Sequence, residues 1–306
     1  MPDKVEFESR RITLKGELYR SEHSAPNRKG AAIVIGHPMG GVKEQTAATH
    51  AKRFAEEGFF ALTFDAAYQG QSRGQPRNLE DPTQRAEDVR AAVTYLSLVP
   101  EVDPERIGAL GICASGGYVP YAAQTDLRIK AVATVSAADV GSLFREGLKG
   151  TEMKIDRNAL QKTLRLAGEA RLAEAKGEQP PCIPIVPDDP EKVTEGTPDM
   201  FREGSEYYRT ERGNHPRSNN RFLLRSCDLM VNYSSYAFID LISPRPLLMI
   251  AGADADTRYF SEDAVARARD PKELFIVPGK THVDLYDDLS VSFPKLLKFM
   301  TKFLTH

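Results

Sequence analysis

The stretch RIGALGICASGGYVPYAAQ, residues 106–124, decides the fold. An apolar run ends in a group of small residues, and an apolar, helix-like run follows them. This pattern predicts a buried strand, a tight turn and a helix, the local structure known as a nucleophile elbow. Two residues that could act as the nucleophile, Cys113 and Ser115, lie two positions apart in the turn.

Short apolar runs alternate with amphipathic segments on both sides of this stretch. The runs at 31–36, 59–64 and 129–137 are almost continuously apolar, which is typical of strands buried on both faces. Between them, apolar residues recur at helical spacing, for example around 47–55 and 89–96. The alternation predicts an α/β fold with a mostly parallel central sheet and helices on both faces.

The alternation stops between residues 139 and 241. This segment contains a helix-like stretch at 158–178, a Pro-rich stretch at 180–190 and an Arg- and Tyr-rich stretch at 206–222. It is far longer than the dozen or so residues that a crossover connection usually needs. We therefore expect a core formed by residues 1–138 and 242–306, with a mainly helical cap inserted at 139–241.

Composition excludes several classes of function. The 306 residues carry 41 Lys and Arg against 43 Asp and Glu, which argues against bulk binding to nucleic acid or anionic membranes. The N-terminus has no apolar signal region, and no apolar run approaches the roughly 18 residues that span a bilayer. Three cysteines without CxxC spacing suggest reduced thiols in the cytoplasm. We expect a cytoplasmic protein without metal or organic cofactor, and homo-oligomer formation stays open.

Polar residues follow several of the predicted strands. Because the carboxyl ends of parallel strands meet at one edge of a sheet, these residues should gather there. They are His37, Asp65, Cys113 or Ser115, Asp254 or Asp256, and His282. The order nucleophile, acid, base along the chain is the order found in α/β-hydrolases.

Five motifs carry a resemblance to a known family. They are GHPMGG (36–41), DAAYQGQSRG (65–74), RIGALGICASGGY (106–118), RPLLMIAGADADTRYFSEDA (245–264) and PGKTHVDLYD (278–287). The chain resembles α/β-hydrolases of the dienelactone hydrolase-like type over nearly its whole length, including a bacterial branch of hydrolases and the related fungal polyketide transferases. The resemblance implies the α/β-hydrolase fold, but the superfamily hosts many chemistries, so it names no substrate.

The choice of nucleophile depends on strand register. Both Cys113 and Ser115 have the small flanking residues that the turn requires, so the flanks do not decide. In the superfamily pattern that the chain resembles, the nucleophile lies seven residues after an Arg, and counting from Arg106 reaches Cys113. A cysteine elbow is also similar to that of dienelactone hydrolases. A helix N-terminus and a nearby His282 would lower the pKa of a thiol at position 113. We therefore favour Cys113, with Ser115 as a small residue that starts the next helix.

His282 is the predicted general base, and the acid that orients it is ambiguous. Asp254 and Asp256 both follow a buried strand, and the resemblance favours Asp256. Asp65 follows an earlier strand and is expected to stabilise its own turn. The GQSRG sequence at 70–74 resembles a second elbow motif, but it lies too far from the preceding strand and is interpreted as a loop.

Backbone amides should form the oxyanion hole. The N–H of Ala114 follows the nucleophile directly, and the second donor should be the N–H of Met39 in the HPMGG loop. Gly40 and Gly41 would let that loop turn tightly. His37 precedes the turn and is expected to be structural.

The cap contains a cluster of cationic and aromatic residues. They are Tyr207, Tyr208, Arg209, Arg212, His215, Arg217 and Arg221. The arginines could recognise a substrate carboxylate or phosphate. We favour the alternative that they form ion pairs that attach the cap to the core.

These observations predict a hydrolase of a carboxylic ester, thioester or lactone. Cys113 would form an acyl-enzyme, Met39 and Ala114 would hold the oxyanion, and His282 with Asp256 would activate water. The partner is then a small-molecule substrate. Two alternatives stay open: an acyltransferase that uses the same acyl-enzyme, and a non-catalytic ligand-binding member of the fold.

Overall fold

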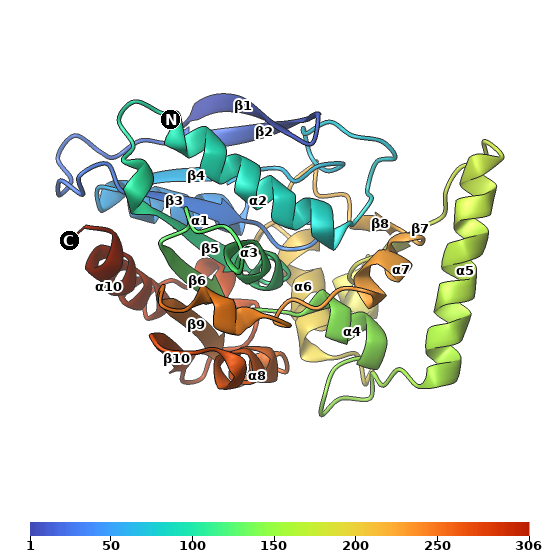
Figure 1. The fold of residues 1–306 in the computed structure, drawn as a ribbon. Coiled ribbons are helices and arrows are strands. Elements are labelled where there is room, and N and C mark those ends of the chain that lie inside the picture. Colours follow the sequence, from blue (N-terminus) through green and yellow to red (C-terminus); the bar gives the residue numbers. More distant parts are fainter. Residues whose placement is uncertain (306) are drawn as a thin grey trace.

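A single eight-stranded sheet organises the molecule in the computed structural model, which describes residues 1–305 (Figure 1). Its strand order is β1-β2-β4-β3-β5-β6-β9-β10. The strands are β1 (Asp3–Ser9), β2 (Ile12–Tyr19), β3 (Ala32–Gly36), β4 (Phe60–Phe64), β5 (Ile107–Ile112), β6 (Ala131–Val135), β9 (Leu247–Gly252) and β10 (Lys272–Val277). β2 runs antiparallel to β1 and β4, and the other neighbouring pairs are parallel. The predicted mostly parallel sheet is confirmed.

Helices cover both faces of the sheet. They are α1 (Thr46–Glu56), α2 (Pro82–Ser97), α3 (Ser115–Ala123), α8 (Arg258–Arg267), α9 (Asp284–Asp287) and α10 (Ser292–Leu304), with a short 3₁₀ turn η1 (Pro104–Arg106) before β5. Within β3, Val34 belongs to the apolar cluster that includes α2 and α3 residues, whereas Ile33 and Ile35 belong to the cluster that includes α1 and α10 residues. Burial on both faces explains why β3 is continuously apolar in sequence.

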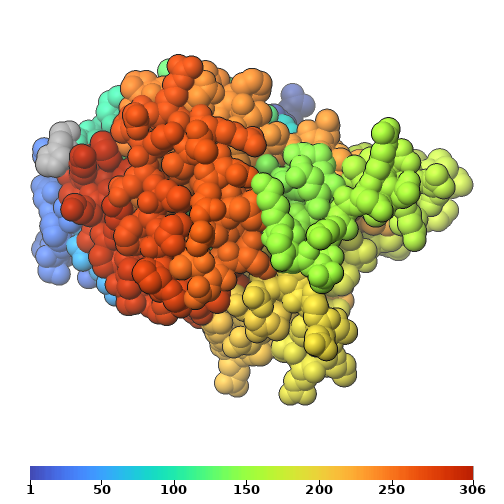
Figure 2. Space-filling model, turned by 90° about the horizontal axis from the view of Figure 1, so that it is seen from below, coloured from blue at the N-terminus to red at the C-terminus, as the bar shows by residue number. Residues whose placement is uncertain are grey.

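Residues 139–241 connect β6 to β9; the part at 140–231 lies beside the sheet, whereas Tyr236 and Ile239 near its end pack in the core (Figure 1). They form α4 (Val140–Glu146), α5 (Arg157–Ala175), β7 (Cys182–Pro184), η2 (Pro190–Lys192), α6 (Asp199–Arg209), β8 (Arg221–Leu223), α7 (Ser226–Val231) and η3 (Ile239–Ile242). β7 and β8 pair with each other and not with the main sheet. Figure 2 shows the green and yellow parts of this segment as a lobe that projects beyond the body of the protein.

The loop after β4 is built around Asp65, which is completely buried. Its carboxylate accepts hydrogen bonds from the backbone N–H of Lys43, the Nζ of Lys43 and the N–H of Gln71. Ser72, the serine of GQSRG, donates to the carbonyl of Asp65 at 2.5 Å. Both residues therefore stabilise their own loop, as the sequence predicts. Within residues 1–305, no helix combines the length and the apolar character that crossing a bilayer requires.

Candidate active site

The turn between β5 and α3 holds Cys113 in a strained conformation. Its φ is +56°, in the left-handed region that non-glycine residues rarely adopt. Gly111 makes the turn feasible, because a Cβ at that position would lie 2.0 Å from the carbonyl oxygen of Ser115. This backbone geometry is the strand–turn–helix of a nucleophile elbow, with Cys113 at its tip.

Cys113 and Ser115 face different environments. The Cys113 side chain lines a cavity, whereas Ser115 is buried and its Oγ donates to the carbonyl oxygen of His37 at 2.6 Å. A Cβ on Gly36 would meet the Ser115 hydroxyl at 2.8 Å, so the serine packs against the end of β3. Of the two sequence candidates, only Cys113 reaches the cavity.

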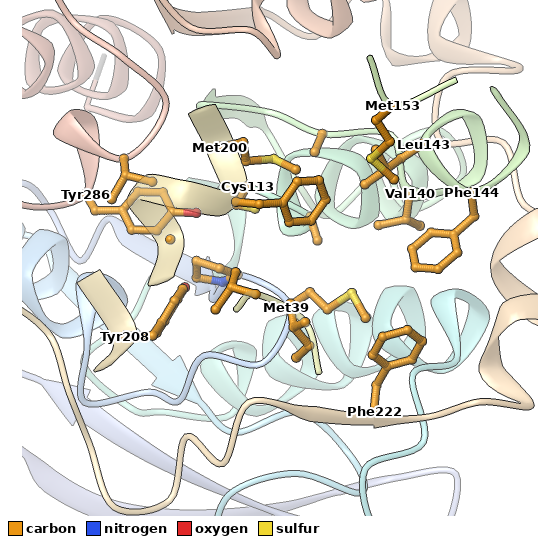
Figure 3. Close-up of a pocket in the computed structure, with 18 residues that line it drawn as sticks. Met39, Cys113, Val140, Leu143, Phe144, Met153, Met200, Tyr208, Phe222 and Tyr286 are labelled. Atoms are coloured by element: carbon orange, nitrogen blue, oxygen red, sulfur yellow. The ribbon is translucent and has the colours of Figure 1, made fainter. Parts of the chain in front are cut away.

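The cavity has a volume of about 90 Å³ and lies between the sheet edge and residues 139–241 (Figure 3). Among its lining residues, only Cys113, Tyr208 and Tyr286 carry a polar side-chain atom, and none is charged. The apolar side chains that form its walls are Pro38, Met39, Ala114, Ala138, Val140, Leu143, Phe144, Met153, Ile185, Val186, Met200, Phe201, Phe222 and Val283. The site therefore favours an uncharged, apolar group next to the thiol.

Two backbone amides face the Cys113 sulfur. The N–H groups of Met39 and Ala114 both hydrogen-bond to the thiol and act to lower its pKa. The Met39 loop turns through Gly40, whose φ is +72°, and the N–H of Gly41 closes the turn on the carbonyl of Pro38 at 3.0 Å. These are the two amides that the sequence predicts as an oxyanion hole.

Burial nevertheless dominates the chemistry of the thiol. Desolvation raises the pKa of Cys113 above its ordinary value, and the opposing effects of its hydrogen bonds with Tyr286, Ala114 and Met39 on this pKa are smaller. The expected lowering of this pKa by the helix N-terminus and His282 is wrong for the resting site. The reason is that burial disfavours the charged thiolate, and His282 makes no direct hydrogen bond to the sulfur within residues 1–305.

His282 lies in the loop after β10 and is buried. Its backbone carbonyl accepts a hydrogen bond from Ser136 Oγ at 2.7 Å. The ring nitrogens face two hydroxyls: Nδ1 lies 2.6 Å from Thr257 Oγ1, and Nε2 lies 3.2 Å from the hydroxyl of Tyr286. Burial lowers the pKa of His282 to about 3, so the resting imidazole is neutral.

The two candidate acids differ in burial. Asp254 is exposed, whereas Asp256 is partly buried and its Oδ2 accepts a hydrogen bond from the N–H of Met200 at 3.0 Å. The other oxygen, Oδ1, is buried without a hydrogen-bond partner, and burial raises the pKa of Asp256. The structure does not join Asp256 to His282 by a hydrogen bond. Thr257, the next residue, takes that position, and its neutral hydroxyl can pair with the neutral imidazole.

Sequence reasoning missed Thr257 and Tyr286. Thr257 directly follows Asp256 in the motif at 245–264, and Tyr286 lies four residues after His282 in the motif at 278–287. The i,i+4 spacing from His282 was a usable signal, because residues four apart lie on one face of a helical turn.

The remaining polar candidates pack around the site. His37 is buried, accepts a hydrogen bond from the N–H of Ala66 at 3.1 Å and contacts Arg85, which fits the predicted structural role. Among the cap arginines, Arg212 binds Asp287 through two hydrogen bonds of 2.7 and 2.8 Å. Arg217 pairs with Glu44.

None of the arginines of the cluster lines the cavity. The pairs of Arg212 and Arg217 join the cap to the core and fit the interpretation as structural ion pairs. Arg221 instead pairs with Asp188 inside the cap, and Arg209 hydrogen-bonds the carbonyl of Ser218. Within residues 1–305, no group of three His, Cys, Asp or Glu side chains is arranged to hold a metal ion.

The fold and the elbow define an α/β-hydrolase. The sequence model of the Dienelactone hydrolase family matches residues 15–137. Protein YcjY of Escherichia coli K12 is 38% identical over 291 residues, covering 94% of this chain and 93% of its own. Protein PA2218 of Pseudomonas aeruginosa is 40% identical over 98% of this chain and 80% of its own. The chain belongs to the same family as these two proteins, a dienelactone hydrolase-like branch of the α/β-hydrolases, and is an enzyme of the hydrolase type.

Solved structures agree with this assignment. The crystal structure of PA2218 superposes with a TM-score of 0.91 at 38% identity, over 99% of this chain and 94% of that chain. The α/β hydrolase GrgF of Penicillium sp. sh18 superposes with a TM-score of 0.84 over the whole of both chains, and its 24% identity supports the fold alone. A curated relative of that name, from Penicillium sp., is described as a polyketide transferase and is 26% identical over 95% of this chain and 92% of its own.

Proposed function

We propose that this protein cleaves a carboxylic ester, thioester or lactone through an acyl-enzyme on Cys113. The observation that carries the proposal is the position of Cys113. It lies at the tip of a strained elbow, on an apolar cavity, with the Met39 and Ala114 amides directed at its sulfur. A non-glycine residue that is held in such a strained backbone is typical of functional positions.

In the proposed first step, Cys113 loses its proton and attacks the substrate carbonyl carbon. The carbonyl oxygen becomes an oxyanion that the Met39 and Ala114 amides stabilise. His282 accepts the thiol proton and then donates it to the leaving alcohol or thiol as the tetrahedral intermediate collapses. Because both the thiol and the imidazole are neutral at rest, the proton moves during attack and not from a preformed ion pair.

In the second step, His282 activates water, which attacks the thioester carbonyl and releases the acid. Asp256 has a buried oxygen without a partner, and we propose that it compensates the imidazolium that forms in both steps. The neutral Thr257 hydroxyl cannot supply this compensating charge.

The lining of the cavity suggests the substrate class. Apolar side chains surround Cys113 and no charged side chain is among them, so the acyl part should be apolar and uncharged. A charged acyl group would lose its hydration without gaining a partner.

Acyl transfer is the second candidate function. Tyr208 and Tyr286 are the only side chains in the cavity lining that could hydrogen-bond a hydrolytic water, and Tyr286 already faces His282. An apolar acceptor alcohol or thiol would suit this lining as well as water does. The relative described as a polyketide transferase fits the same chemistry.

The test is a panel of p-nitrophenyl esters with intact-protein mass spectrometry. We expect wild type to gain one acyl group on Cys113, Cys113→Ala to lose both labelling and turnover, and Ser115→Ala to keep labelling. Adding an alcohol or thiol acceptor separates the two candidates, since only a transferase makes the new ester in preference to the free acid. If Cys113→Ala keeps full turnover while Ser115→Ala loses it, the assignment of the nucleophile is wrong.

A further inference from the structure

The hydroxyl of Tyr286 lies between the two groups that must exchange a proton. It is 3.2 Å from Nε2 of His282, and it also hydrogen-bonds the Cys113 thiol. Figure 3 shows the Tyr286 ring directed across the cavity floor, with its oxygen pointing toward Cys113. In this arrangement, the connection from the thiol to the imidazole passes through the tyrosine.

We propose that Tyr286 relays the proton from Cys113 to His282 when the nucleophile attacks. This inference rests on the proposed acyl-enzyme function. The S–H bond of Cys113 breaks as a new O–H bond forms on Tyr286, and the original O–H bond of Tyr286 breaks as an N–H bond forms on Nε2 of His282. At the same time the sulfur bonds to the substrate carbonyl carbon, and the electron pair of the C=O π bond moves onto the oxygen. The tyrosine is neutral before and after, and the products are the tetrahedral oxyanion bonded to Cys113 and an imidazolium. When the tetrahedral intermediate collapses, the bond to the leaving group breaks, Tyr286 donates its proton to the leaving oxygen or sulfur, and Nε2 of His282 returns a proton to Tyr286.

A hydroxyl suits this position because it donates and accepts at the same time. Tyr286 is buried, and burial raises its pKa well above the ordinary value, so it stays protonated and does not form a stable phenolate. The relay is therefore concerted, with no charge resting on the tyrosine.

Neighbouring rings hold the hydroxyl in place. Tyr207 packs edge-on against the Tyr286 ring with centroids 5.2 Å apart, and the His282 ring lies 5.6 Å away. The Tyr207 hydroxyl faces the backbone of Thr46 and lies outside the cavity lining. Tyr207 thus contacts the same ring without reaching the reacting atoms.

This difference supplies a matched pair of variants. Tyr286→Phe keeps the ring and removes only the relaying hydroxyl, while Tyr207→Phe removes a hydroxyl from the ring packed against it. We expect acylation of Cys113 by p-nitrophenyl butyrate, followed as the burst of p-nitrophenolate, to slow at least tenfold in Tyr286→Phe. Tyr207→Phe should stay within twofold of wild type. Acylation of Tyr286→Phe at the wild-type rate or faster overturns the relay.

A second measurement needs no variant and would not respond to a merely structural tyrosine. The acylation rate of wild type is measured in mixtures of H₂O and D₂O. After the rates are corrected for the known deuterium fractionation of the resting thiol, a relay that moves two protons in one step gives a curved dependence on the deuterium fraction, whereas a single direct transfer gives a straight line and overturns the proposal. Failure of the function is recognisable separately, since wild-type protein whose Cys113 is never acylated overturns the acyl-enzyme and the relay together.

Discussion

The imidazole Nδ1 of His282 lies 2.6 Å from the hydroxyl oxygen of Thr257, and not against a carboxylate. The carboxylate of the preceding residue, Asp256, instead accepts the N–H of Met200, at the start of α6, and leaves its second oxygen unpaired. Burial keeps the imidazole neutral and raises the pKa of Asp256. The arrangement is that of a resting site, in which no positive charge on His282 needs compensation.

This relationship predicts different effects for the two neighbours. Asp256→Asn removes the charge that the imidazolium needs in the transition state, and we expect kcat/KM to fall by about 10²-fold or more, since loss of the equivalent carboxylate in a serine protease triad costs roughly 10⁴. Thr257→Val removes only a neutral partner and should cost about tenfold, with Thr257→Ser close to wild type. A larger loss in Thr257→Val than in Asp256→Asn would assign the orienting role to the threonine.

The main elements of the fold could be predicted because they depend on patterns that are local in sequence. Continuous apolar runs identified the buried strands such as β3, and the small residues around Cys113 identified the elbow. Once the strands are parallel, their carboxyl ends meet, so the positions of Met39, Cys113 and His282 at one edge follow from topology.

The polar contacts of the site could not be predicted in the same way. Which oxygen faces Nδ1 of His282 depends on rotamers and burial, and Asp256 and Thr257 are adjacent in sequence. The raised pKa of Cys113 likewise depends on how deeply the elbow is covered, which composition does not reveal. The position of Tyr286 between thiol and imidazole required the three-dimensional structure.

The aromatic pair Phe144 and Phe222 should limit acyl length. Both line the cavity, from α4 and β8, and their rings meet edge-to-face with centroids 5.8 Å apart. Phe222→Ala should open this wall and raise the ratio of kcat/KM for p-nitrophenyl octanoate over butyrate by about tenfold, since each methylene that gains a pocket contributes roughly 1 kcal/mol or more. Phe238→Ala, at a residue that is 62% exposed, is the control and should leave the ratio unchanged.

A buried aromatic residue can also contribute to folding, so stability must be measured alongside chain-length preference. Phe222→Leu changes less volume and should shift the ratio in the same direction by a smaller factor. If both Phe222 variants fold with melting temperatures near that of wild type and keep its chain-length preference, the acyl group lies elsewhere in the cavity.

The ion pair between Arg212 and Asp287 should affect stability and not substrate choice. Arg212 holds Asp287 through two hydrogen bonds, next to Tyr286 in sequence, but it does not line the cavity. Both side chains are partly exposed, so a double-mutant cycle with Arg212→Ala and Asp287→Ala should give a coupling of about 1 kcal/mol or less. Activity on neutral and carboxylate-bearing esters should change by the same factor. A selective loss of the anionic esters in Arg212→Ala would instead favour substrate recognition.

Buried histidines should make the fold sensitive to mild acid. Burial lowers the pKa of His50 to about 4 and that of His282 to about 3, against an ordinary value of about 6.5 in the unfolded chain. Below pH 6.5 the unfolded chain therefore binds more protons, and each histidine lowers the free energy of unfolding by up to about 1.4 kcal/mol per pH unit as the pH falls. Burial raises the pKa of Asp88 to about 6. Between roughly pH 4 and 6 the folded protein therefore binds more protons at Asp88 than the unfolded chain does, so this group raises the free energy of unfolding as the pH falls and offsets the effect of one histidine.

His50→Asn isolates this effect, because the asparagine amide can replace the Nδ1 hydrogen bond to the Thr46 carbonyl but does not titrate. The variant should be less stable than wild type at pH 7, and the difference should narrow by about 2 kcal/mol between pH 7 and pH 5 in urea unfolding. Asp88→Asn should change the pH dependence of the free energy of unfolding in the opposite direction, because it removes a carboxyl group that gains protons when the chain folds. A constant difference between wild type and His50→Asn across this range would mean that His50 is not held neutral in the folded protein.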